Sequence, residues 1–445
     1  SSITGGMVKV GSDSNLGAGA ITLNGNGWLG VTATTTIDNA IILNSSPAVI
    51  DVSSGAVATL TGVIGETGGS RGLNKSGAGT LVIGADATYT GVTNLNGGVF
   101  ELAATRTLAT SGITLNNSSP TLKVTGDGTF ATAITVRGSG TNTISVDGAV
   151  TLSGLVSLDS GASANRAVVK AGTGTLTLGN GGNAAAGSVV SGSNTYTLDL
   201  TVSGGTVAVA ADANLVAGTV TLSGGTLSVT GATTIDNAIA VSSASTIDNS
   251  VAVTLSGVIS GAGALTKSGS ETLTLSGTQT GTGGLNVTAG TLAVAGDANL
   301  TGGTVTLNGG TLSVTGAGTI DNAVALGSNG GTVTNSAAVT LSGAISGAGA
   351  LTKTAAGTLT LSGANTYTGG TTVSAGTLTG TTTSLQGNIT NNAAVVFSQS
   401  SAGTYAGVLS GTGSLTKAGT GNVTLSGANT YSGGTTVSAG TLTGT

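Results

Sequence analysis

Twenty-one residues of this chain recur almost unchanged 64 positions later. LSGANTYTGGTTVSAGTLTGT occupies residues 361–381, and LSGANTYSGGTTVSAGTLTGT occupies residues 425–445, with the single change of Thr368 to Ser432. Two further pairs of similar segments lie 85 and 86 positions apart: 218–241 with 303–326, and 261–277 with 347–363. The spacings of 64 and 86 differ by 22. We interpret them as three and four copies of a unit of about 21–22 residues.

Short strands with alternating polarity make up each unit. In GTLTLSG (357–363), Leu359 and Leu361 alternate with Thr358 and Thr360, and Gly and Ser follow. A period of two places the leucines on one face of a strand and the threonines on the other. Such strands are too short to form a stable sheet alone, and a unit of this size cannot enclose a core. Stacking of successive units solves both problems.

The sequence therefore predicts an all-β parallel solenoid, with about three strands in each coil. Leu, Val and Ile point inward, and Thr, Ser and Asn point outward. We expect residues 1–445 to form one continuous solenoid of roughly twenty coils, a rod of about 100 Å. The 81 glycines suit corners that need positive φ, and the presence of only two prolines suits strands whose N–H groups are all paired.

The composition argues against several classes of protein. Charged residues make up 6% of the chain, and the net charge is −5, so we expect no nucleic-acid partner. The longest purely apolar run is five residues, which predicts no membrane-spanning segment. The chain has no His or Cys, which argues against zinc sites and imidazole-based catalysis. We expect no metal, no other cofactor and no catalytic residues.

Five lysines lie in similar sequence surroundings, and we call them the marker lysines: Lys75, Lys170, Lys267, Lys353 and Lys417. They could form a binding stripe, but at about four coils apart they cannot converge on a small ligand. We favour solvated or corner lysines that discourage unwanted pairing of strand edges. The spacing of 95 positions between Lys75 and Lys170 does not fit the period.

A tyrosine follows three of these lysines at one constant offset, and these tyrosines are Tyr89, Tyr367 and Tyr431. We favour packing under a turn over a sugar-stacking platform. After Lys170 the corresponding tyrosine, Tyr196, comes twelve positions later than this offset predicts, which indicates an insertion. We place the insertion at 179–192 and expect this segment to protrude as a loop.

The tetrapeptide TIDN occurs four times, with its aspartates at Asp38, Asp236, Asp248 and Asp321. These carboxylates could be ligands or catalytic acids. A catalytic site occurs once, whereas a corner recurs. We therefore favour an Asx-type turn at a coil corner, with stacked asparagines.

Two long segments carry a family resemblance. LTKTAAGTLTLSGANTYTGGTTVSAGTL (351–378) and LTKAGTGNVTLSGANTYSGGTTVSAGTL (415–442) resemble the passenger-associated transport repeat of bacterial autotransporters. The segments at Lys75, Lys170 and Lys267 are similar but match more loosely. The resemblance implies a right-handed β-helix that is exported to the bacterial cell surface, an extracellular location.

The leading hypothesis for function is a non-enzymatic structural or adhesive rod. Surface or matrix carbohydrate is a candidate partner. One alternative is a polysaccharide lyase or glycosidase, which needs convergent carboxylates, whereas the 16 acidic residues here are scattered singly. Another is an array of threonines that binds ice or another solid, since TLT recurs at 175–177, 272–274 and 358–360. The strand preference of Thr also explains these triplets.

The C-terminal coil continues the repeat to the final residue, and Lys417 is the last charged residue. An open, weakly charged strand edge is a template for pairing. We therefore expect the end coils to pair with copies of this chain, end to end in a filament, or with continuing chain.

Overall fold

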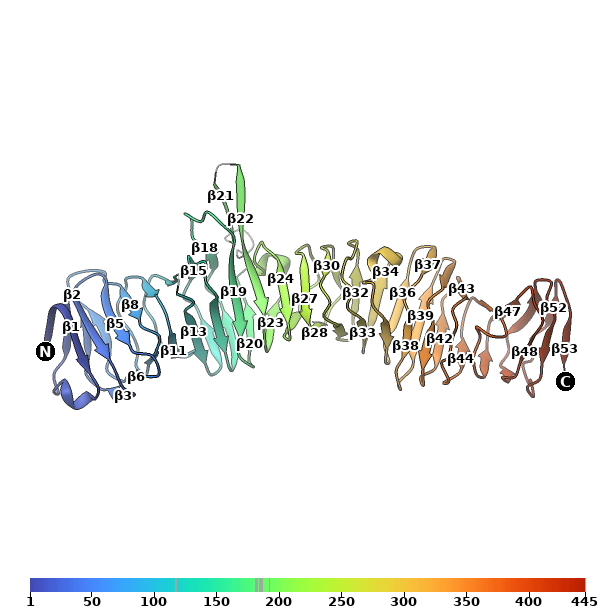
Figure 1. Cartoon of the computed structure of the whole chain (residues 1–445), viewed down its shortest axis with the longest axis horizontal. Helices are drawn as coiled ribbons and strands as arrows, with labels where there is room; N and C mark the ends of the chain where they lie inside the picture. The colour runs from blue at the N-terminus through green and yellow to red at the C-terminus, as the bar shows by residue number, and fades with distance from the viewer. Residues whose placement is uncertain (117, 181–182, 184–186, 192, 445) are drawn as a thin grey trace. The chain divides into compact units, whose positions relative to one another are not determined.

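A computed structural model describes residues 1–116, 118–180, 183, 187–191 and 193–444. These residues form 53 strands and three 3-10 helices, η1 (Asp13–Asn15), η2 (Asp212–Asn214) and η3 (Asp297–Asn299). The fold is the predicted parallel β-solenoid, with about 22 turns. Residues 1–228 and 229–445 form two compact units, which are described separately. Figure 1 shows the strands of each unit stacked turn upon turn.

In unit 1 (residues 1–228) the chain winds around three sheets. Sheet 1 contains β1 (Ser2–Val10), β2 (Ile21–Val31), β4 (Ile41–Leu43), β5 (Ala48–Val52), β7 (Ile64–Glu66), β8 (Leu73–Ser76), β10 (Thr93–Leu95), β12 (Ile113–Leu115), β15 (Ile134–Val136) and β18 (Val156–Leu158). Sheet 2 contains β3 (Thr35–Ile37), β6 (Val57–Leu60), β9 (Thr80–Ile83), β11 (Val99–Ala103), β13 (Thr121–Thr125), β16 (Asn142–Val146), β19 (Arg166–Ala171), β22 (Asn194–Val202) and β24 (Val220–Ser223). Sheet 3 contains β14 (Gly128–Phe130), β17 (Ala149–Leu152), β20 (Thr175–Leu178), β23 (Thr206–Val209) and β25 (Thr226–Val229).

Unit 2 (residues 229–445) repeats the arrangement with sheets 4, 5 and 6. Sheet 4 contains β28 (Ser245–Asn249), β31 (Leu265–Ser268), β33 (Leu285–Val287), β35 (Val305–Leu307), β38 (Val324–Leu326) and β41 (Ile345–Gly347). Sheet 5 contains β26 (Thr233–Ile235), β29 (Val253–Leu255), β32 (Thr272–Leu275), β34 (Thr291–Val294), β36 (Thr311–Val314), β39 (Gly331–Asn335), β42 (Leu351–Thr354), β44 (Thr371–Val373), β46 (Ile389–Asn391) and β49 (Leu409–Ser410). Sheet 6 contains β37 (Gly318–Ile320), β40 (Val339–Leu341), β43 (Thr358–Leu361), β45 (Thr377–Gly380), β47 (Ala394–Ser398), β50 (Ser414–Ala418) and β52 (Thr435–Val437). The remaining strands of unit 2 are β27 (Ile239–Ser243), β30 (Ile259–Ser260), β48 (Gly403–Tyr405), β51 (Val423–Leu425) and β53 (Leu442–Gly444).

The interior of each unit is a continuous stack of aliphatic side chains. In β43, Leu359 and Leu361 are at most 1% exposed, while Thr358 and Thr360 are half-buried on the outer face. Strand pairing between turns is parallel, so like residues lie above one another: Val339 pairs with Leu359, and Leu359 with Leu378. The predicted inward and outward alternation is confirmed. Among the described residues, no helix is long and apolar enough to span a membrane.

The registers explain the spacing of the sequence repeats. In sheet 4, four successive turns carry the pairing from Leu265 through Leu285, Val305 and Val324 to Ile345. Leu351, which begins the next lysine strand, follows Ile345 by six positions and lies in sheet 5. The spacing of 86 therefore contains four turns and a step of one face.

The spacing of 64 also consists of whole turns and a step of one face, but with three turns instead of four. Three turns of sheet 5 carry the pairing from Leu351 through Thr371 and Ile389 to Leu409. Leu415, which precedes Lys417 by two positions, again follows after a step of six and lies in sheet 6. Within unit 2, each lysine strand is thus displaced by one face of the solenoid from the lysine strand before it.

The spacing of 95 between Lys75 and Lys170 also reflects four turns and a step. In sheet 1 the pairing runs from Leu73 through Thr93, Ile113 and Ile134 to Val156. The step from Val156 to Val168, which begins the Lys170 corner on sheet 2, is then twelve positions instead of six. A longer loop between β18 and β19 therefore accounts for most of the difference between the spacings of 95 and 86.

An antiparallel hairpin interrupts the parallel pattern in unit 1. β21 (Ser188–Ser191) pairs with the first half of β22, and Figure 1 shows both extending beyond the neighbouring turns. The turn that pairs Lys170 with Val202 is twelve positions longer than the turn that pairs Lys75 with Leu95. The protrusion of 179–192 as a whole stays a prediction, because residues 181–182, 184–186 and 192 lie outside the described part of the chain.

Candidate functional site: a polar groove lined by asparagine pairs

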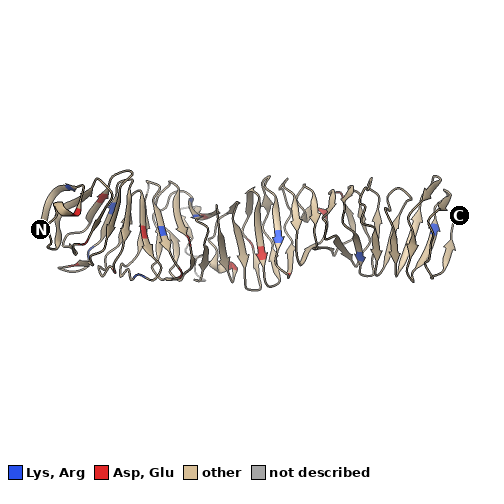
Figure 2. Cartoon of the chain, turned by 90° about the horizontal axis from the view of Figure 1, so that it is seen from below, with Lys and Arg blue, Asp and Glu red and all other residues tan. Residues whose placement is uncertain are grey.

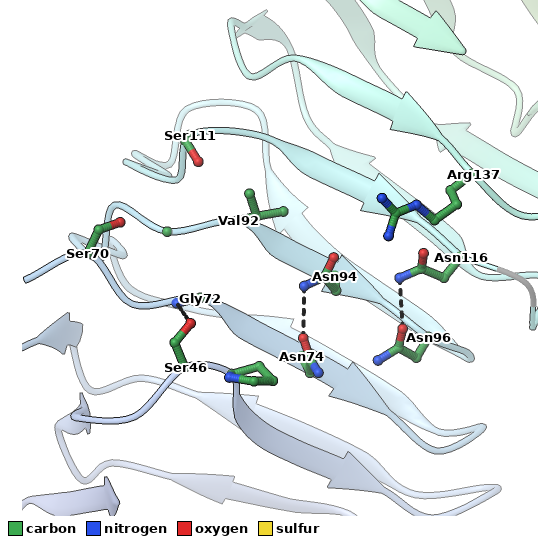
Figure 3. Close-up of a pocket in the computed structure, with 12 residues that line it drawn as sticks. Ser46, Ser70, Gly72, Asn74, Val92, Asn94, Asn96, Ser111, Asn116 and Arg137 are labelled. Atoms are coloured by element: carbon green, nitrogen blue, oxygen red, sulfur yellow. Dashed lines mark hydrogen bonds between the residues drawn. The ribbon is translucent and has the colours of Figure 1, made fainter. Parts of the chain in front are cut away.

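A polar groove of about 510 Å³ lies on the outer face of unit 1. It crosses the turns that contain β8, β10 and β12, and Figure 3 shows its residues. The lining consists of Ser46, Pro47, Ser70, Gly72, Asn74, Gly91, Val92, Asn94, Asn96, Ser111, Asn116 and Arg137. The groove is thus built almost entirely from uncharged polar groups and backbone.

Pairs of asparagines form its floor. In β8, Leu73 and Lys75 point inward, so Asn74 points outward, and Asn94 does the same one turn later. These two asparagines are register partners, and Asn94 Nδ2 donates to Asn74 Oδ1 at 2.9 Å. A second pair lies one turn further on, directly after the ends of β10 and β12, where Asn116 Nδ2 donates to Asn96 Oδ1 at 2.8 Å (Figure 3).

One carboxylate holds the loops at the rim. Glu66, the last residue of β7, accepts hydrogen bonds from Arg71 N at 2.7 Å, Thr90 N at 3.0 Å and Thr90 Oγ1 at 2.7 Å. The bonds from Thr90 are the main cause that lowers the pKa of Glu66. The loops also touch through backbone, since a Cβ on Gly91 would lie 2.3 Å from the carbonyl carbon of Arg71.

The lining of the groove carries almost no net charge. Its one charged lining residue, Arg137, donates from Nη2 to Asp159 Oδ1 at 3.2 Å. No carboxylate is among the lining residues, so the groove has no pair of acids for glycoside cleavage. Figure 2 shows few charged residues along the face in view. On the outer face of sheet 2, Lys123 Nζ lies 3.5 Å from Glu101 and 3.6 Å from Asp147. Among the described residues, no group of three or more Asp or Glu could hold a metal ion.

The five marker lysines are not solvated, which corrects the prediction from sequence. Lys75, Lys170, Lys353 and Lys417 are fully buried, and Lys267 is 3% exposed. Each lies two residues after an inward Leu or Val, so the period-two rule places it inside. The period-two alternation is thus the sequence signal that places these lysines in the interior.

Backbone carbonyl oxygens surround each buried ammonium group. Lys75 Nζ donates to Ser76 O at 2.8 Å, Gly77 O at 2.8 Å and, one turn on, Gly97 O at 3.0 Å. Lys353 and Lys417 repeat the same three bonds at 2.6–3.3 Å. Removal from water lowers the pKa of Lys75 and of Lys170 to about 8. Lys75, Lys353 and Lys417 therefore act as corner clamps between two turns, and Lys170 does the same through Gly204 O at 2.9 Å.

Two of the tyrosines, Tyr89 and Tyr367, pack under the turns as predicted, whereas Tyr431 is half-buried. Tyr89 and Tyr367 are at most 1% exposed, and their hydroxyls bond Thr93 and Thr371 at 2.6 and 2.8 Å. Tyr431 makes the same bond to Thr435 at 2.7 Å. Tyr196 differs, because it lies half-buried in the antiparallel hairpin opposite Val189. The prediction that Tyr196 corresponds to Tyr89, Tyr367 and Tyr431 is therefore wrong.

Three of the four TIDN segments form corners, where the asparagines bond the preceding turn at Asn39 and Asn322. The fourth, residues 246–249, lies within strand β28 instead, where Asp248 Oδ1 accepts a hydrogen bond from Ser268 Oγ at 2.8 Å. Asp38, Asp236 and Asp321 are exposed on separate turns and do not converge. Asn39 is buried, and its Nδ2 donates to Gly17 O at 2.6 Å and Gly19 O at 2.7 Å. Asn322 makes the equivalent bonds to Thr301 O and Gly303 O. These amides tie each corner to the preceding turn.

These observations define a class, a parallel β-solenoid with a recurring corner that contains a buried lysine. Four segments with this corner match the passenger-associated-transport-repeat family, at residues 73–102, 265–294, 351–379 and 415–443. The resemblance seen in the sequence is thereby confirmed at four places and is consistent with an autotransporter passenger domain. No curated protein and no solved structure gives a significant match to the chain.

Proposed function

We propose that the chain is part of an autotransporter passenger and serves at the bacterial surface as a non-enzymatic structural or adhesive scaffold. The observation that carries this proposal is the use of the transport repeat. In the matched segments of Lys75, Lys353 and Lys417 the buried lysine bonds a carbonyl oxygen of the next turn. Lys267 bonds two carbonyl oxygens of its own turn. The residues of the repeat thus contribute to the solenoid itself.

The distribution of acidic residues also supports a non-enzymatic role. The polar groove has no carboxylate in its lining. Asp236 and Asp248 share one turn, but Asp236 follows β26 whereas Asp248 lies within β28. Glu101 and Asp147 come close to each other, and both are held in ion pairs with Lys123 at 3.5 and 3.6 Å. A lyase or glycosidase needs a pair of such groups within reach of one bond.

Two measurements test this proposal. Antibody against the chain should label intact cells of the producing bacterium, and protease added outside should remove the label. The purified chain should release no reducing ends or unsaturated products from a panel of polysaccharides. Turnover of any of them would refute the non-enzymatic role, and label confined to the cell interior would refute the location. End-to-end assembly stays a prediction, which light scattering at increasing protein concentration can test.

A second candidate function is binding to an ordered solid, and one feature of unit 2 favours it. Sheet 5 carries an unbroken outer column of seven threonines, each the register partner of the next: Thr272, Thr291, Thr311, Thr332, Thr352, Thr372 and Thr390. Neighbouring strands in a sheet are about 4.8 Å apart, so the hydroxyls form a regular row. The sequence alone showed only scattered TLT triplets.

Ice is the solid that tests this candidate directly. If the column binds ice, the purified chain should show thermal hysteresis, and Thr332→Lys with Thr352→Lys should abolish it. Thr135→Lys, on the outer face of unit 1, is the matched control and should retain it. A wild-type chain without hysteresis would argue that strand preference alone explains the threonines.

A further inference from the structure

We propose that the polar groove of unit 1 is a binding site for a neutral, hydroxyl-rich oligosaccharide. This inference deepens the adhesive part of the proposed function and rests on it. The groove is assembled by the successive turns that contain β5, β8, β10, β12 and β15, and its lining comes from strand residues and from the loops on either side of them. A site of this kind exists only where the turns are stacked in register.

The asparagine pairs supply the chemistry that recognises hydroxyl groups. Within a pair, one N–H of Asn94 is used by Asn74. The amide of Asn74 keeps both N–H donors, and Asn94 keeps its carbonyl oxygen. The second pair leaves the same groups on Asn96 and Asn116. Each pair therefore offers donors and acceptors side by side, which matches a sugar hydroxyl that both donates and accepts.

The spacing of these amides favours an extended chain over a compact ligand. Register partners on adjacent turns lie about 4.8 Å apart, and Asn94 and Asn96 are separated by two residues of strand, about 7 Å. All four side chains are half-buried, with their polar ends in the groove (Figure 3). A ligand that contacts both pairs must span several hydroxyl-bearing units.

The charges indicate that the ligand is neutral. Arg137 is the one charged group in the lining, and Asp159 already neutralises it. At the rim, the charge of Glu66 is accompanied by the opposite charge of Arg71, from whose backbone N–H it accepts a hydrogen bond. An anionic sugar would therefore find no unpaired cation in the lining to attract it.

The rim is held in place before any ligand arrives. Glu66 fixes both the 67–71 loop and the segment at Thr90. Ser46 Oγ accepts a hydrogen bond from Gly72 N at 3.4 Å and fixes the next loop. Val92, at 39% exposed, adds an apolar surface for the C–H face of a sugar ring. A preformed site loses less conformational entropy on binding.

Saturation-transfer NMR of the intact chain with cellohexaose as the probe tests the proposal, with hexagalacturonate as the charged counterpart. We expect transfer to cellohexaose and little to hexagalacturonate. Asn94→Leu with Asn96→Leu should weaken cellohexaose binding by about tenfold or more, since two or more hydrogen bonds are lost. Ser70→Trp should also weaken it by filling the groove from its rim, with the floor unchanged.

Asn286→Leu is the matched control, because Asn286 occupies the position of Asn94 in the repeat that contains Lys267, in unit 2. It should bind cellohexaose as the wild type does. Circular dichroism and the urea midpoint report whether each variant is folded. Absence of transfer to cellohexaose, equal binding by the Asn94/Asn96 variant, or a preference for hexagalacturonate would each overturn the proposal. None of these results bears on the surface location, which the antibody experiment decides separately.

Discussion

At the lysine corner, the identity of a single residue determines how easily the backbone adopts the conformation that the corner requires. The residue two positions after the lysine has positive φ in all five repeats. It is glycine in four of them, with φ of 75° at Gly77, 78° at Gly172, 74° at Gly269 and 76° at Gly419. In the fifth repeat it is Ala355, with φ of 60°. The left-handed region disfavours residues with a Cβ, so Ala355 stores strain that its counterparts avoid.

Ala355→Gly is therefore expected to stabilise the chain. Relief of the left-handed strain, about 1–2 kcal/mol, exceeds the added flexibility of glycine in the unfolded chain, about 0.5–1 kcal/mol. Urea denaturation should show a higher midpoint. The reverse change, Gly269→Ala, should lower it, because its Cβ would lie 2.2 Å from Asn249 O. Equal midpoints for Ala355→Gly and wild type would mean that the corner has relaxed around Ala355.

Lys75 gives the stability of unit 1 a characteristic pH dependence. Its pKa is about 8 in the folded chain and about 10.4 when unfolded. Between these values the unfolded state binds more protons, so the free energy of unfolding rises with pH. The cost of burying the charge is complete below pH 8 and is relieved above it. Urea midpoints at pH 7, 8, 9 and 9.5 should therefore increase.

Lys75→Met is the control for this effect, since it fills the same space without a titrating group. The increase in midpoint should be smaller in the variant, with the remainder due to Lys170, Lys267 and Lys353, whose pKa values burial also lowers. A wild-type midpoint that falls across this range while that of Lys75→Met stays constant would show that the three carbonyls favour the ammonium form more than burial opposes it.

Corners and inserted segments determine whether a turn can vary in length without loss of the fold. The turn after Lys170 is the longest of those described, yet it returns to register at Leu200 and Val202. Asn183 explains how one part of it remains tied to the core. Its side chain is fully buried, with Oδ1 accepting from Val156 N at 2.9 Å and Nδ2 donating to Asn214 O at 2.9 Å.

The long turn should therefore tolerate changes in the hairpin but not at Asn183. Replacing residues 190–195 by Asn-Gly, a favoured two-residue turn, should alter the free energy of unfolding by less than about 1 kcal/mol. Asn183→Ala should cost roughly 2 kcal/mol or more, because a buried N–H and a buried carbonyl lose their partners. Thermal unfolding of the two variants measures the difference. A larger loss from the hairpin replacement would mean that β21 supports the stack.

The number of exposed Lys and Arg side chains in each unit determines how readily trypsin can cleave it. Unit 2 contains three basic residues, Lys267, Lys353 and Lys417, and all are at most 3% exposed. In unit 1, by contrast, Lys9, Arg106 and Arg137 are exposed. Unit 2 therefore offers trypsin no exposed basic side chain among its described residues.

Trypsin should consequently cut the native chain in unit 1 alone. Brief digestion is expected to cleave after Arg106 and Arg137 and to leave residues 229–445 intact, as mass spectrometry of the fragments would show. Digestion in urea is the control and should cut after all three lysines of unit 2. Cleavage after Lys353 under native conditions would mean that its corner opens readily.

Much of the fold follows from patterns within a few residues. The alternation of Leu359 and Leu361 with Thr358 and Thr360 predicts which side chains are buried, and the recurring segments predict stacked turns. These features are local, because the period of a strand is fixed by backbone geometry. The same rule, applied without regard to charge, also places Lys75 in the interior.

The groove and the progress of the lysines around the solenoid depend instead on register. Turns differ widely in length, so nothing local in the sequence indicates that Asn74 and Asn94 are partners, or that Asn96 meets Asn116. The step that moves Leu351 onto a new sheet is hidden within the repeat spacing. Register is set by hydrogen bonds between distant segments and by corner residues such as Asn322, which is why it emerges only when the turns are stacked.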